Sequence, residues 1–108
     1  MIIDIGQLAF MHPMLRAIAL WIEDETGLCF TSTSLYRIGD KGVHGQLPLR
    51  GIDLRMRNEK VGRVIVDLIN EHFQYDYNRP DMKCAILHGE GANLHIHLQV
   101  YTTTRKVK

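Results

Sequence analysis

The most informative segment of the chain reads Asn93-Leu94-His95-Ile96-His97-Leu98-Gln99-Val100. Polar and apolar residues alternate along it, which predicts a β-strand with one buried face. Side chains on a strand repeat every two residues, so His95 and His97 point to the side opposite the apolar residues. Two imidazoles on one rigid strand can bind a metal together, or one can bind it while the other transfers protons.

The composition is that of one ordinary globular domain. A chain of 108 residues has room for a single core, so we expect one domain over residues 1–108. Hydrophobic residues make up 45% of the chain and charged residues 23%, which is typical of globular proteins. The formal net charge of +1 gives no electrostatic support to nucleic-acid binding, so no nucleic-acid partner is expected.

The N-terminus does not have the pattern of an export signal. Asp4 and Gln7 interrupt its only apolar segment, and no apolar run in the chain approaches the length of a membrane span. We therefore expect synthesis in the cytoplasm without a signal peptide and no membrane association. Action at the cell wall would require release by another factor.

Periodicities along the chain predict two helices and about four strands. Helical spacing of apolar residues extends over residues 7–26 and 60–73. Strands are expected over residues 28–38, 51–56, 82–88 and 93–102, with a tight hairpin turn at residues 89–91. This order predicts an α+β fold, in which a small antiparallel sheet of about four strands carries two flanking helices on one face.

The basic chain end and the two cysteines are expected to have no functional role. Residues 105–108 are basic and short, which favours a frayed, solvated terminus over a binding tail. Cys29 and Cys84 each lie in an apolar run, which favours buried free thiols and leaves a disulfide open.

The segment from residue 43 to residue 55 supplies the other ligand types that a zinc site needs. Ile52 and Leu54 would face the core, so Asp53 lies on the opposite face, where a carboxylate needs a cation or donors to offset its desolvation. His44 from the preceding glycine-rich loop, Asp53 and one strand histidine would leave a coordination position of zinc open for water. Such a metal lowers the pKa of that water and polarises a carbonyl.

The order His, Asp and His-x-His, with an arginine-bearing strand upstream, resembles the LAS-type zinc metallopeptidases. That family includes D-alanyl-D-alanine carboxypeptidases and phage or bacterial peptidoglycan endopeptidases. The resemblance covers residues 31–100. It implies a single peptidase-like domain, a Zn²⁺ cofactor and cleavage of peptide bonds in the stem peptides of peptidoglycan.

The resemblance also assigns roles to individual residues. The implied metal ligands are His44, Asp53 and His97. His95 would serve as the catalytic base, because Leu94 replaces the glutamate of the carboxypeptidase branch. Arg37 would polarise the scissile carbonyl or hold a substrate carboxylate through its planar fork of donors.

The residues around His44 differ from the family's pattern in two ways. The first concerns the segment between His44 and Asp53, and the second the residues just before His44. That segment is longer than the usual spacing and contains Pro48, and Gly42-Val43 replaces the serine that usually precedes the histidine. These departures leave two other functions open. One is a zinc or cell-wall binding module without catalysis, and the other is a metal-free structural or interaction protein of a phage.

Several site residues also have structural alternatives. His95 and His97 could be solvated on an exposed sheet face, and Arg37 could be an exposed strand residue. Asp53 could form an ion pair with Arg55 or Arg50. Two reserve candidates complete the expected site residues, His88 as a ligand and Glu90 as the base.

Overall fold

The computed structural model describes residues 11–34 and 50–108 of the chain. Its helices are α2 (Pro13–Thr26), α3 (Glu59–His72) and the short 3-10 helix η2 (Gly91–Asn93). Its strands are β1 (Ser32–Ser34), β2 (Gly51–Arg55), β3 (Phe73–Gln74), β4 (Ala85–His88), β5 (His95–Gln99) and β6 (Arg105–Lys106). Strands β1-β2-β5-β4 form an antiparallel sheet in that order, and β3 pairs with β6.

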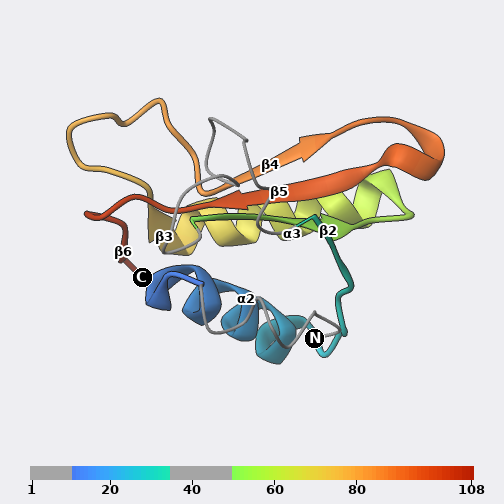
Figure 1. The fold of residues 1–108 in the computed structure, drawn as a ribbon, viewed down its shortest axis with the longest axis horizontal. Helices are drawn as coiled ribbons and strands as arrows, with labels where there is room; N and C mark the ends of the chain where they lie inside the picture. Colours follow the sequence, from blue (N-terminus) through green and yellow to red (C-terminus); the bar gives the residue numbers. More distant parts are fainter. Residues whose placement is uncertain (1–10, 35–49) are drawn as a thin grey trace.

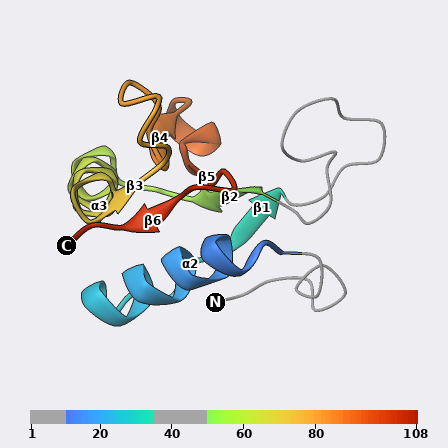
Figure 2. The same cartoon turned by 90° about the vertical axis from the view of Figure 1, so that its left-hand side faces the viewer.

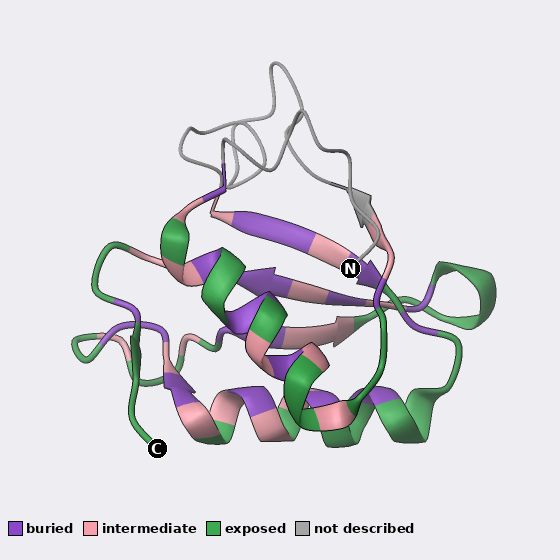
Figure 3. Cartoon of the chain, turned by 90° about the horizontal axis from the view of Figure 1, so that it is seen from below, coloured by how far each residue is buried: buried purple, intermediate pink, exposed green. Residues whose placement is uncertain are grey.

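Both long helices lie on the same side of the four-stranded sheet (Figure 1). The core lies between these two layers, where Figure 3 colours stretches of the helices and the sheet as buried. Its largest fully buried side chains are Leu15, Ile18, Ile22, Ile52, Leu54, Ile65, Ile69, Cys84, Ile96, Leu98 and Val100. The α+β architecture predicted from the sequence is therefore confirmed.

Helix α2 begins at Pro13, although the apolar spacing predicted a start at residue 7. The residue before a proline disfavours the helical conformation, and His12 has an extended backbone with φ −57° and ψ 136°. Its Nδ1 accepts a hydrogen bond of 3.1 Å from the backbone N–H of Met14 and so caps the helix. Helix α3 agrees with the prediction to within one residue at each end, and Asn58 caps it through a 3.1 Å bond from the N–H of Val61.

The strands are shorter than their sequence patterns predicted. The strand expected over residues 28–38 is represented by β1, and residues 35–38 lie outside the described residues. Strand β5 ends at Gln99 because the chain turns back, with the N–H of Tyr101 donating to the Thr104 hydroxyl at 2.7 Å. The prediction of a tight turn at residues 89–91 was wrong. The connection between β4 and β5 extends over residues 89–94 and contains η2.

The C-terminus is solvated, as predicted, because residues 105–108 are exposed, but it is not frayed. Arg105 and Lys106 form β6, and the β3–β6 pair lies beside α3 (Figure 2). The Lys108 ammonium forms a 2.6 Å ion pair with Glu71 of α3. The cysteine prediction holds for one residue: Cys84 is a buried free thiol whose burial raises its pKa to about 12, whereas Cys29 is free but exposed after α2.

The connection between β4 and β5 depends on a close approach at Gly89. Its φ is +84°, and a Cβ built on it would lie 2.3 Å from the backbone oxygen of Asn93. Gly91 also has a positive φ, +55°, but a Cβ there would meet nothing within 4 Å. Gly89 therefore carries a steric constraint in addition to the conformational one that both residues share.

We expect Gly89→Ala to destabilise the fold more than Gly91→Ala. Forcing an alanine into the left-handed region costs about 1–2 kcal/mol, and only at Gly89 does the methyl group also collide with a backbone carbonyl. Urea denaturation of the two variants measures the difference in their free energies of unfolding. Equal losses would show that the approach to Asn93 does not constrain this connection.

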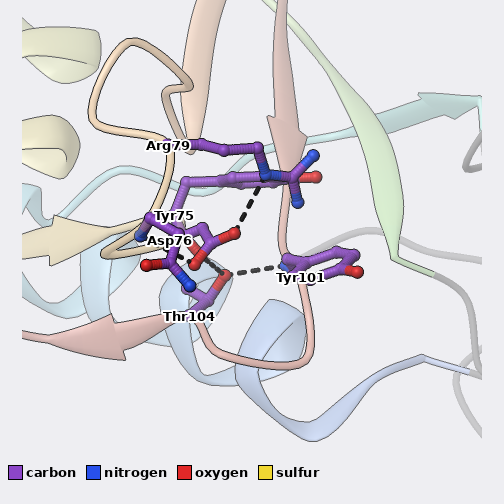
Figure 4. Close-up of polar contacts among 6 residues, drawn as sticks. Tyr75, Asp76, Arg79, Tyr101 and Thr104 are labelled. Atoms are coloured by element: carbon purple, nitrogen blue, oxygen red, sulfur yellow. Dashed lines mark hydrogen bonds and ion pairs between the residues drawn. The ribbon is translucent and has the colours of Figure 1, made fainter.

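A polar cluster ties the segment after β3 to the end of β5 (Figure 4). The carboxylate of Asp76 accepts hydrogen bonds from the Nε of Arg79 at 2.9 Å and from the N–H of Asn78 at 3.1 Å. The Arg79 guanidinium lies 4.4 Å from the centre of the Tyr101 ring, a cation–π arrangement. The Thr104 hydroxyl donates to the backbone oxygen of Tyr75 at 2.7 Å and so returns the chain towards β3.

The Asp76 carboxylate makes the stability of this cluster dependent on pH. Hydrogen bonds from the Asn78 N–H and then from Arg79 lower its pKa below the usual value. A lowered folded-state pKa contributes stability above the unfolded-state pKa of about 4, and this contribution disappears as the pH falls through the folded-state value. We expect the melting temperature of Asp76→Asn to fall less than that of the wild type between about pH 4 and pH 2.

Asp81→Asn provides the control, because Asp81 is an exposed aspartate in the same connection. Its melting temperature should follow the wild-type pH profile. Identical acid slopes for the wild type and Asp76→Asn would contradict the role given to the Asp76 carboxylate.

Candidate functional site

Pairing of β2 with β5 assembles a polar surface on the sheet face opposite the helices. In the antiparallel register Asp53 lies opposite His97, and Arg55 lies opposite His95. The alternate residues of both strands are the buried aliphatic side chains that face the helices. The face that carries Asp53 is therefore set by the hydrophobic core beneath it.

Asp53 and His97 are in direct contact although 44 positions separate them in the sequence. The Nδ1 of His97 lies 2.9 Å from Oδ1 of Asp53. The two side chains are only 18% and 16% exposed, so water competes weakly for their contact. The structure thus brings together two of the three residues that the resemblance implied as metal ligands.

Gln99 orients the other side of the His97 ring, a role that the sequence did not reveal. The amide Nε2 of Gln99 donates a 2.7 Å hydrogen bond to the backbone oxygen of Lys83. This bond turns Oε1 of the amide towards Nε2 of His97, 3.2 Å away, where the ring nitrogen must donate. Gln99 shares the strand parity of His95 and His97, and that parity was the available signal.

The arrangement of His97 fits a metal ligand. Metal-binding histidines usually donate their second ring N–H to an oxygen, as Nε2 of His97 does to Gln99. Nδ1 faces the Asp53 carboxylate, which only accepts, so Nδ1 carries the hydrogen in this contact. A bound zinc would take the place of that hydrogen, and imidazole with carboxylate is a donor set that suits zinc. Two ligand atoms of a tetrahedral zinc are about 3.3 Å apart at bond lengths of 2.0–2.1 Å. The observed separation of 2.9 Å needs only a small adjustment to reach this value.

His95 is arranged differently from His97. Its Nδ1 lies 2.8 Å from the backbone oxygen of Asn93, which can only accept, so Nδ1 carries the hydrogen. In the neutral ring Nε2 is then the acceptor nitrogen. The ring stacks on that of His88 at a centroid distance of 5.8 Å. Nε2 of His95 therefore remains open to accept a proton.

A pocket of about 460 Å³ opens beside this polar surface. Its lining residues are Asp53, Arg55, Ala92, Asn93, Leu94 and His95. A substrate bound there would contact the expected base and one expected ligand together. Asp53 and His95 therefore lie at a pocket that can hold a substrate.

Among the other expected site residues, the described part of the chain brings His88 to this surface, where its ring centre lies 5.8 Å from that of His95 and 6.5 Å from that of His97. Arg37 and His44 lie outside the described residues, and among residues 11–34 and 50–108 no group of three potential ligands could hold a metal. His88 is exposed at the end of β4. Glu90 is exposed and lines a separate pocket with Arg57 and other residues. Within the described part, Arg55 forms no ion pair with Asp53.

Comparisons with models of protein families, with curated proteins and with solved structures found no match to this chain. Within the part that the structure describes, no helix has both the length and the apolar character needed to cross a membrane.

We expect Gln99→Met to change the state of the His97 ring while leaving the fold intact. The variant keeps a side chain of similar length but leaves the Lys83 oxygen and Nε2 of His97 without their partner, at a cost of about 1–3 kcal/mol in unfolding free energy. Long-range ¹H–¹⁵N NMR of the imidazole rings reports the protonated nitrogen directly. The Nε2–H signal of His97 should exchange faster in Gln99→Met.

Gln99→Glu is the matched control, because it retains an oxygen acceptor for Nε2. Its His97 Nε2–H signal should resemble that of the wild type. An unchanged signal in Gln99→Met would show that Gln99 does not determine the ring's protonated nitrogen.

Proposed function

We propose that this protein is a zinc-dependent hydrolase that cleaves peptide bonds in the stem peptides of peptidoglycan. The observation that carries the proposal is the 2.9 Å contact between Nδ1 of His97 and Oδ1 of Asp53, beside a pocket lined by His95. The His-x-His motif and the family resemblance support the same chemistry. The peptidoglycan substrate would become accessible after the protein is released from the cell that makes it.

The proposed metal ligands are His44, Asp53 and His97. When bound, zinc would polarise the substrate carbonyl and lower the pKa of a nearby water. Gln99 accepts from Nε2 of His97, so Nδ1, which donates to Asp53 without a metal, would be the ligand nitrogen once zinc replaces its hydrogen. The chain thus supplies the proposed ligand atoms and, in Gln99, a side chain that orients the His97 ring.

His95 is the proposed general base. Its Nε2 takes a proton from the water as the water oxygen forms a bond to the carbonyl carbon. It returns the proton to the peptide nitrogen as the carbon–nitrogen bond breaks. The hydrogen bond from Nδ1 to Asn93 keeps the ring oriented during both transfers. Arg37 would donate to the carbonyl oxygen as negative charge develops there.

We expect His97→Ala and His95→Ala to separate metal binding from proton transfer. His97→Ala should lose both zinc and hydrolysis, because it removes a ligand. His95→Ala should retain zinc while the hydrolysis rate falls about 100- to 10,000-fold. Protein purified without a metal-affinity tag is used for metal analysis and for measuring the amino groups released from purified peptidoglycan.

Glu90→Gln distinguishes His95 from the reserve base and should hydrolyse peptidoglycan at the wild-type rate. Loss of zinc in His95→Ala with retention in His97→Ala would mean that the two roles are reversed. Wild-type protein that binds no zinc under these conditions and releases nothing from peptidoglycan would refute the proposed function.

A zinc or cell-wall binding module without turnover is the second candidate. Leu94, at the position of the glutamate in the carboxypeptidase branch, favours it. Zinc in the purified protein, with sedimentation on peptidoglycan but no released peptide, would support this alternative. A metal-free phage structural or interaction protein would bind no zinc.

A further inference from the structure

The histidines on the polar face of the sheet differ in how many of their ring nitrogens have a partner. Both nitrogens of His97 are engaged, Nδ1 with Asp53 and Nε2 with Gln99. His95 has a partner only at Nδ1, which leaves its Nε2 open. The His88 ring forms no hydrogen bond to any residue in the described ranges 11–34 and 50–108. The open nitrogens of this face therefore belong to His88 and His95.

The backbone holds His88 and His95 against each other. The two residues are directly opposed in the antiparallel register of β4 and β5. Strand β4 is the last strand of the sheet, and the side-chain amide of Asn70 from α3 bonds to both backbone groups of Ala85, at 2.9 and 3.0 Å. Strand β4 is thus fixed by β5 on one side and by Asn70 on the other, which maintains the register of the histidine pair.

The separation of the two rings suits a shared metal ion. Their centres lie 5.8 Å apart, and their planes differ by 17°. Zinc–nitrogen bonds of about 2.0–2.1 Å place the centres of two imidazoles on one tetrahedral zinc about 5 Å apart. The rings of His88 and His95 need to approach by less than about 1 Å, and rotation of the exposed His88 side chain can supply this.

We propose that His88 and His95 form a second zinc site, separate from the one at Asp53 and His97, and that zinc bound there inhibits the protein. Imidazole is a ligand that suits zinc. No third side chain completes a metal-binding group among residues 11–34 and 50–108, so water would fill the remaining coordination positions. The second site does not depend on the proposed function, but its inhibitory effect rests on it.

Inhibition follows from the nitrogen that the second zinc would occupy. In the proposed function, Nε2 of His95 accepts the proton of the attacking water. The same lone pair would bind the second zinc, and a nitrogen whose lone pair is in use cannot accept a proton. His95 also lines the 460 Å³ pocket, so the ion would lie at the edge of the space that can hold a substrate.

Calorimetry with ZnCl₂ on His97→Ala tests the second site without turnover, because this variant lacks a ligand of the first site. It should bind one zinc ion. Adding His88→Gln should weaken this binding at least about tenfold, since losing even a group that only supports a ligand costs about 10- to 100-fold. The matched control is His12→Asn, which removes an imidazole but retains the cap of α2, and its affinity should be unchanged.

The zinc-dependent shifts of the imidazole NMR signals identify the ligands directly. In His97→Ala the ring ¹⁵N signals of His88 and His95 should shift together as zinc is added. MgCl₂ should shift neither signal, because magnesium prefers oxygen ligands. Asp53→Asn also removes a ligand of the first site and provides a second background in which the fold does not depend on the His97 substitution.

Peptidoglycan hydrolysis with zinc at one equivalent and in excess tests the inhibition. Excess zinc should lower the wild-type rate, and the fraction of the rate lost should be smaller in His88→Gln. Each protein is compared with its own rate at one equivalent. Wild-type hydrolysis that continues at full rate while zinc shifts the His95 signal would overturn the inhibitory role.

Other outcomes would overturn the second site itself. Zinc binding that His88→Gln does not weaken would do so, as would a single wild-type zinc lost in both His88→Gln and His97→Ala, which would indicate one shared site. Zinc bound through His88 in a protein that hydrolyses nothing would retain the second site and refute the hydrolase. Hydrolysis with one zinc, and none bound by His97→Ala, would retain the hydrolase and refute the second site.

Discussion

The antiparallel register between β2 and β5 is the constraint on which the rest of the molecule depends. A shift of one residue would turn every side chain of a strand to the other face of the sheet. Ile52 and Leu54 on β2, with Ile96 and Leu98 on β5, are fully buried against the helices and prevent such a shift. The same register therefore builds the core on one face and aligns Asp53 with His97 on the other.

The two histidines of β5 differ because their surroundings differ. His95 faces the Asn93 carbonyl, and His97 faces the amide of Gln99 on one side and Asp53 on the other. Each partner in turn has its own support. Gly89 permits the close approach to Asn93, and the Lys83 oxygen fixes the orientation of Gln99. Two chemically identical side chains thereby acquire different hydrogen-bond partners on the same strand.

The sequence predicted the parts of this arrangement that depend on local periodicity. Alternation on residues 51–56 and 93–100 placed Asp53 and the two histidines on their face, and helical spacing located α3 to within one residue at each end. The pairing of β6 with β3 could not be predicted, because each strand has two residues, too few to show an alternating pattern, and the strands are about 30 residues apart. The importance of Gln99 was hidden for a related reason, since its orienting partner is the Lys83 oxygen of a different segment.

The Asp53–His97 contact carries the desolvation cost of a largely buried ionisable pair. Removing an ionisable pair from water costs free energy that its mutual attraction often fails to recover, and apolar residues of similar volume are frequently as stable in the same place. Both side chains are more than four-fifths buried, and the opposite face of the same strands already supplies a complete aliphatic core. A sheet selected for stability alone would gain little from this pair. A cation held by Asp53 and His97, as proposed above, would offset that desolvation cost.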